Sequence, residues 1–154
     1  MRKFSDTDRK KKSSRIILPD NPGGLFEEKL HLLEQAVMAG LDGNYVTCLS
    51  GWKIAKDSGV SRLDVGAMID KLGIRVADCQ LGCFKVNKTA YTGAAAEPLN
   101  VDVTRGIEAL KDSDDLTCKA MHDLAYELKI TPMSIANVAN AKGYKIRQCQ
   151  LGCF

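Results

Sequence analysis

Residues 79–84 read Cys79-Gln80-Leu81-Gly82-Cys83-Phe84, and the same six residues close the chain at 149–154, a shift of 70 positions. Matches at a fixed period are the sequence sign of a duplicated structural unit. Further outward, the same ungapped shift superposes Thr47-Cys48 on Thr117-Cys118, Ala55 on Ala125 and Gly73 on Gly143. We therefore expect two copies of one unit.

The repeat sets the expected domain boundaries. They are a disordered basic arm at 1–22, a first unit at 23–84, a linker at 85–97 and a second unit at 98–154. Thr, Gly, Ala and Pro residues after Lys85 suit a linker. The chain has 154 residues, 45% of them apolar, which is enough for one ordinary domain or two very small ones. A large enzyme is excluded.

Each unit is expected to be mostly α, with three helices. Apolar residues spaced by three and four predict a first helix with one buried side, lined by Phe26, Leu30, Leu33, Val37 and Leu41, or by Val103, Ile107 and Leu110. Thr47 and Thr117 suit the N-cap of a second helix at about 48–57 and 118–128. A third helix buries Val65, Met68, Ile69 and Leu72, or Ile135, Val138 and Ala139.

A short strand or wing is expected after the third helix. Gly73 and Gly143 end that helix. Residues 74–76 and 144–146 then alternate apolar and basic side chains, which is typical of a strand with one buried face. If the residues before the second helix pair with this strand, Cys48 lies near Cys79.

The stretch Ile54-Ala55-Lys56-Asp57-Ser58-Gly59-Val60-Ser61 resembles the helix-turn-helix family and, more loosely, its winged-helix branch. That pattern has a small residue on the second helix, a glycine in the turn and an aliphatic residue six further on, as at Ala55, Gly59 and Val65. The second copy keeps Ala125 and Ile135 but has Lys129 in the turn. A left-handed conformation there costs on the order of 1 kcal/mol. We expect a looser or differently shaped turn in that copy.

The resemblance implies DNA binding and transcription regulation through the third helix of each unit. The outward residues expected there are Arg62, Asp64, Ala67, Asp70 and Lys71 in copy one, and Ser134, Asn137, Asn140 and Lys142 in copy two. An arginine can read guanine and an asparagine can read adenine. The candidate DNA-binding residues on these helices are Arg62, Lys71, Ser134, Asn137 and Asn140. Little positive charge accompanies them, so weak DNA binding is expected.

The N-terminal arm is expected to strengthen this binding. Residues 1–15 hold seven basic and two acidic residues, including Lys10, Lys11 and Lys12, which suits contact with a polyanion. Two alternatives stay open. The arm is also explained as a solubilising terminus, and the two units as helical scaffolds that bind a protein partner.

All six cysteines belong to the repeat, with the same spacing in each copy: Cys48, Cys79 and Cys83, then Cys118, Cys149 and Cys153. Three thiols gathered at one end of each unit suit zinc or an iron–sulfur cluster, and a metal or redox sensing role. Three ligands are one short of the usual four. Core packing and a reversible disulfide therefore remain alternatives, and so does a cysteine-ligated module that docks a protein without binding DNA.

Other chemistry is absent from the sequence. It has no glycine-rich phosphate loop, no dinucleotide fingerprint and no nucleophile elbow, and we expect no catalytic residues and no enzyme. No apolar run is long enough to span a membrane, and the first thirty residues are charged where a secretory signal is apolar. These observations favour a cytoplasmic protein with reduced cysteines.

Overall fold

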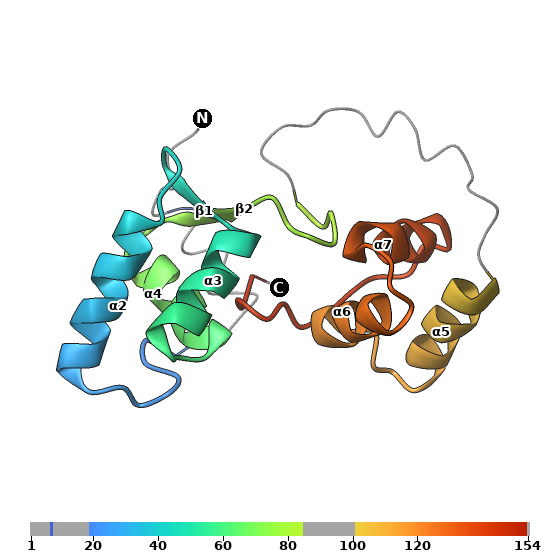
Figure 1. Cartoon of the computed structure of the whole chain (residues 1–154), viewed down its shortest axis with the longest axis horizontal. Helices are drawn as coiled ribbons and strands as arrows, with labels where there is room; N and C mark the ends of the chain where they lie inside the picture. Colours follow the sequence, from blue (N-terminus) through green and yellow to red (C-terminus); the bar gives the residue numbers. More distant parts are fainter. Residues whose placement is uncertain (1–6, 8–18, 85–100, 154) are drawn as a thin grey trace. The chain divides into compact units, whose positions relative to one another are not determined.

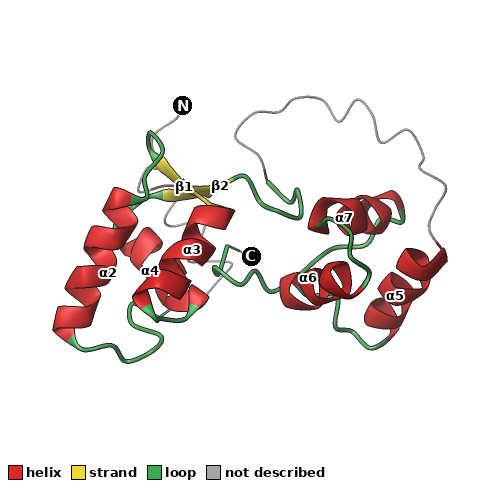
Figure 2. Cartoon of the chain, in the orientation of Figure 1, coloured by secondary structure: helices red, strands yellow, loops and turns green. Residues whose placement is uncertain are grey.

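Figure 1 shows a computed structural model of the chain, which describes residue 7, residues 19–84 and residues 101–153. Within these residues the protein is mostly helical, with six helices and one two-stranded parallel sheet (Figure 2). The expected linker and most of the expected N-terminal arm lie outside the described residues.

The described residues group into two compact units. Unit 1 consists of residues 19–79 together with 150–153, and unit 2 consists of residues 80–84 together with 101–149. The sequence placed each copy of the repeated ending with the unit that precedes it. In the structure the boundary instead falls after Cys79 and again after Cys149, so the two endings are exchanged between the units.

Unit 1 contains α2 (Glu27–Ala39), β1 (Tyr45–Thr47), α3 (Cys48–Ser58), α4 (Arg62–Lys71) and β2 (Arg75–Ala77). β1 and β2 pair in parallel, with Val46 opposite Val76. The pairing expected in this copy between the residues before the second helix and the strand after the third is therefore present, and α3 and α4 connect the two strands. The core of the unit comes from Leu33, Val37, Val46, Ile54, Val65, Met68 and Ile69, all buried.

Unit 2 repeats this plan with less sheet. It contains α5 (Val101–Asp112), α6 (Cys118–Glu127) and α7 (Pro132–Ala141). The strand expected at 144–146 is reduced to one parallel bridge between Thr117 and Arg147, the counterpart of the Thr47 and Ala77 pair. Val103, Ile107, Met121, Ile135 and Ala139 are buried in its core. None of the helices in the described residues has the length and apolar content to cross a membrane.

The helix caps follow the sequence closely. Thr47 and Thr117 cap α3 and α6 as expected, each accepting a hydrogen bond from a backbone N–H in the first turn. The apolar stripe expected on the first helix is correct at Leu33 and Val37 but wrong at Phe26, whose side chain is 87% exposed. Phe26 is the N-cap of α2 and stands outside the helix proper.

The start of α4 is held by a buried carboxylate. Asp64 is only 4% exposed and accepts hydrogen bonds from the backbone N–H of Gly23 at 2.7 Å and of Ser61 at 3.0 Å, and from the Ser61 hydroxyl at 2.5 Å. Ser61 in turn caps the Asp64 N–H, which completes a capping box. Asp64 therefore joins the N-terminal turn of unit 1 to α4.

Removal of this carboxylate should destabilise unit 1. We expect Asp64→Ala to lower the free energy of unfolding by about 2–3 kcal/mol, because part-buried donors on Ser61 and Gly23 lose a charged acceptor. Urea titration followed by the fluorescence of Trp52, which lies in unit 1, measures this change. Asp57→Ala is the control, since Asp57 is exposed and makes only an ion pair with Lys53 one helical turn away; it should cost less than about 0.5 kcal/mol. Equal losses for the two variants would contradict the prediction.

The turn before the third helix has the same backbone shape in both units. Gly59 has φ 61° and Lys129 has φ 54°, so both residues are left-handed. The expectation of a differently shaped turn in the second copy is therefore wrong at this residue. Lys129 adopts the left-handed conformation although its Cβ makes that conformation sterically unfavourable.

A reciprocal pair of substitutions tests this cost. Lys129→Gly should stabilise unit 2 by about 0.5–1 kcal/mol, because relief of the left-handed strain exceeds the entropy that glycine adds to the unfolded chain. Gly59→Ala should destabilise unit 1 by about 1 kcal/mol for the opposite reason. Thermal unfolding followed by circular dichroism measures both, and a loss of stability in Lys129→Gly would refute the account.

Candidate nucleic-acid interface

The face of α4 that was expected to point outward is largely covered. Asp64 and Ala67 are 4% and 3% exposed, so the prediction that both face solvent is wrong. Asp64 lies against the N-terminal turn through Gly23, and the neighbouring Gly66 lies against Leu151 of the C-terminal segment. Of the expected outward residues, only Lys71, at the end of the helix, is fully exposed.

Arg62, the residue expected to read guanine, is already engaged within unit 1. Its guanidinium carbon lies 3.4 Å from the centre of the Trp52 ring, and it donates a hydrogen bond to the side-chain oxygen of Gln150. The planar guanidinium suits both stacking and forked hydrogen bonding. In this arrangement Arg62 holds the C-terminal segment in place, and α4 offers little to a DNA groove.

The third helix of unit 2 differs in its exposure. Ser134 and Asn140 are exposed and Asn137 is half-buried, and residues at this spacing of three lie on one face of α7. α7 has no charged residue, so it presents amide and hydroxyl groups without a carboxylate that would repel phosphates. Among the sequence candidates, the α7 face (Ser134, Asn137 and Asn140) is therefore the set that the structure brings together at the surface.

The charges around α7 are partly neutralised. Lys142 donates a hydrogen bond to Glu108 at 2.8 Å, and this bond raises the pKa of Lys142 above its ordinary value of 10.5. Lys142 therefore stays cationic at neutral pH, but its charge is paired inside the unit. Lys129, before α7, and Lys145, after it, are exposed and carry positive charge on either side of the helix. Lys10, Lys11 and Lys12 lie outside the described residues.

A second face of unit 2 is acidic. A groove of about 590 Å³ runs between α5 and α6, and its lining includes the carboxylates of Asp102, Asp115, Asp123 and Glu127. Arg105 and Lys119 pair with Asp102 and Asp123. This concentration of acidic residues disfavours a nucleic acid at the α5 and α6 face.

The six cysteines do not form the expected clusters. Cys48, Cys79, Cys118 and Cys149 are buried, whereas Cys83 is exposed and Cys153 is half-exposed. Among the described residues, which include all six, no three Cys, His, Asp or Glu side chains are grouped so that they could hold a metal, and no disulfide joins two cysteines. The exchange of the endings leaves three cysteines in each unit, Cys48, Cys79 and Cys153 in unit 1 and Cys83, Cys118 and Cys149 in unit 2.

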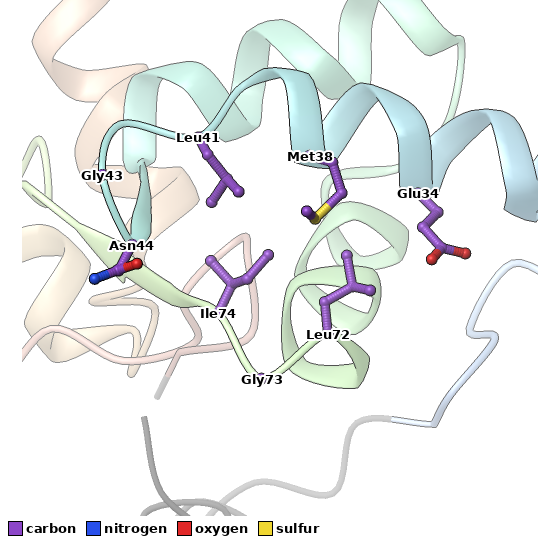
Figure 3. A pocket seen from close by; sticks show the side chains of 8 residues that line it. All are labelled: Glu34, Met38, Leu41, Gly43, Asn44, Leu72, Gly73 and Ile74. Atoms are coloured by element: carbon purple, nitrogen blue, oxygen red, sulfur yellow. The ribbon is translucent and has the colours of Figure 1, made fainter. Parts of the chain in front are cut away.

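Sequence patterns did not indicate a groove in unit 1. It has a volume of about 430 Å³ and lies between the end of α2, the turn after it and the end of α4 (Figure 3). Met38, Leu41, Leu72 and Ile74 give it an apolar lining, with Glu34 and Asn44 at its edges. The sequence signal for this groove is that its apolar residues have charged or polar counterparts in the second copy.

The matching positions of unit 2 hold Glu108, Lys111, Lys142 and Tyr144. There an ion pair joins Lys142 to Glu108, and the Lys111 ammonium lies 5.5 Å from the centre of the Tyr144 ring. Polar pairs thus occupy in one copy the positions that are apolar in the other.

Neither a family model, nor a curated protein, nor a solved structure matches the chain. The likeness of residues 54–61 to the helix-turn-helix pattern therefore rests on the sequence of this chain alone.

The burial of the cysteines predicts an order of thiol reactivity. Cys83 should react first with iodoacetamide in the native protein, because an exposed thiol is accessible to the reagent while a buried one requires local opening. Cys48, Cys79, Cys118 and Cys149 should be protected until denaturant is added. Mass spectrometry of digested samples taken over time measures each site, and uniform labelling of all six in the native protein would contradict the burial pattern.

Proposed function

We propose that the protein binds DNA through the α7 face, with the basic N-terminal segment supplying most of the attraction to the phosphate backbone. The single observation that carries the proposal is the exposure of Ser134 and Asn140 on a helix that has no charged residue. Asparagine amides can donate to and accept from adenine in the major groove, and each such pair is worth about 1–3 kcal/mol of discrimination.

The charge distribution supports different roles for unit 2 and the N-terminal segment. Residues 101–149 hold seven basic and seven acidic residues, so unit 2 has no net charge with which to attract DNA. Residues 1–15 hold seven basic residues against two acidic ones. Because phosphate contacts supply the sequence-independent part of DNA affinity, the N-terminal segment is the source of affinity and α7 the source of any base preference.

Unit 1 has a different role in this proposal. Its residues 19–79 hold six basic and nine acidic residues, and α4 is covered. We assign DNA contact to unit 2 and to the N-terminal segment, and not to Arg62.

The salt dependence of binding tests the role of the N-terminal segment. Replacement of Lys10, Lys11 and Lys12 by Gln should reduce the slope of log affinity against log salt by about 3, since each phosphate contact contributes about 0.9. Mobility-shift titrations of random duplex DNA at several salt concentrations measure the slope. The control replaces Lys29, Lys53 and Lys56 of unit 1, which removes the same charge and should leave the slope nearly unchanged. No retardation of DNA by the intact protein at low salt would overturn the proposal.

Base preference tests the α7 face separately. Asn140→Ala should weaken binding to duplexes selected from a random pool by about 1–3 kcal/mol, and should leave binding to unselected duplexes unchanged. Asn44→Ala is the matched control, because Asn44 is an exposed asparagine on a turn of unit 1. Equal affinities of the intact protein and Asn140→Ala for the selected duplexes would exclude Asn140 as a base contact.

A further inference from the structure

The C-terminal segment 150–153 forms part of the interior of unit 1. Leu151 is fully buried at 0% exposure, and Gly152 beside it is buried too. Every other described residue of unit 1 comes from residue 7 or from 19–79. The segment is therefore a short piece of chain end seated on a body made from distant sequence, and the receiving surface is built without it.

Two glycines make room for the segment. A Cβ on Gly51 of α3 would lie 3.0 Å and 3.3 Å from the two methyl carbons of Leu151, so the leucine side chain uses the space that a side chain would take. A Cβ on Gly66 of α4 would overlap the Leu151 carbonyl oxygen and lie 2.8 Å from the carbonyl carbon. Backbone cannot yield as a flexible side chain can, so Gly66 is the stricter requirement.

Polar contacts fix the direction of the segment. Arg62 donates a hydrogen bond to the Gln150 side chain while its guanidinium stacks on Trp52. The surface thus receives the Leu151 side chain between Gly51 and Gly66, and the Gln150 amide at Arg62. These features define a site with three points of recognition, and the sequence Gln-Leu-Gly supplies all of them.

The second copy of the repeat does not conserve this surface. The positions that match Gly51 and Gly66 are Met121 and Ala136, and both are fully buried. A methionine side chain and a Cβ occupy those positions in unit 2. Unit 2 therefore lacks the two glycines that contact Leu151 in unit 1, although it includes Gln80, Leu81 and Gly82, which have the same sequence as 150–152, and Leu81 is fully buried.

We propose that the surface formed by Gly51, Arg62 and Gly66 is a binding site for a Gln-Leu-Gly peptide segment, and that the C-terminus of a second copy of this chain fills it when the chain's own segment is displaced. Residues 150–152 meet unit 1 through one buried leucine, its contacts with two glycines and one side-chain hydrogen bond, and the same residues of a second copy can make each of these contacts. A second copy supplies an identical sequence, and exchange of a chain end is an established route to dimers.

A pair of complementary full-length variants tests the proposal. The donor, Gly66→Ala, keeps its C-terminus but has a blocked site, and alanine is a better helix former than glycine, so α4 itself is not weakened. The acceptor, Leu151→Asp, keeps its site but has an ending that cannot be buried. Light scattering after size exclusion should show each variant alone at the mass of one chain, 16.8 kDa, and their mixture at twice that mass.

The control is a chain that carries both substitutions and so neither donates nor accepts. It should give no dimer with the donor. If donor and acceptor are both folded by circular dichroism and remain monomeric when mixed, the second copy is not the partner and the proposal fails. The dimerisation result does not depend on whether the protein binds DNA in the mobility-shift experiments. The two proposals can therefore fail independently.

The intact protein provides a measurement that does not depend on the folding of the variants. An excess of the peptide Gln-Leu-Gly-Ser-Phe should displace the C-terminal segment and increase the rate at which iodoacetamide labels Cys153, which is half-exposed in the seated segment. The peptide Gln-Asp-Gly-Ser-Phe should leave that rate unchanged. Equal rates with the two peptides would show that the surface does not select leucine, and would overturn the proposal.

Discussion

One buried carboxylate holds the third helix of unit 1 against the N-terminal turn, and unit 2 has a serine at the matching position. Asp64 accepts three hydrogen bonds from Gly23 and Ser61, and thereby fixes the N-terminal turn of the unit against the first turn of α4. Its counterpart in the repeat is Ser134, which is exposed and bonds only within its own cap. A hydroxyl cannot replace a carboxylate that serves three donors. The same three-helix plan therefore produces a covered third helix in one unit and an open one in the other.

The two copies also differ at other positions that line surfaces of unit 1. Gly51 and Gly66 become Met121 and Ala136, and the apolar groove of unit 1 becomes a set of polar pairs in unit 2. Glycines that contact Leu151 in unit 1 are replaced in unit 2 by Met121 and Ala136, whose side chains are buried.

The sequence predicted the local structure well and the exchange of segments not at all. Thr47, Thr117 and Gly59 have the caps and the left-handed turn that local chemistry requires, since these features depend only on residues a few positions apart. The outward face of α4 was mispredicted because Asp64 is polar, and periodicity assigns a polar residue to solvent unless its partners are known. The destination of residues 80–84 and 150–153 depends on contacts at long sequence separation. Only the two glycines signalled it, and neither stands out until it is compared with the second copy.

The parallel pairing of β1 and β2 has a consequence for how unit 1 assembles. Tyr45 and Arg75 are opposite each other across a connection that contains all of α3 and α4, so their pairing closes a loop that includes both helices. Even then unit 1 lacks its last piece. Residues 150–153 are the final described part of the polypeptide to leave the ribosome, and until they emerge Gly51 and Gly66 have no leucine between them.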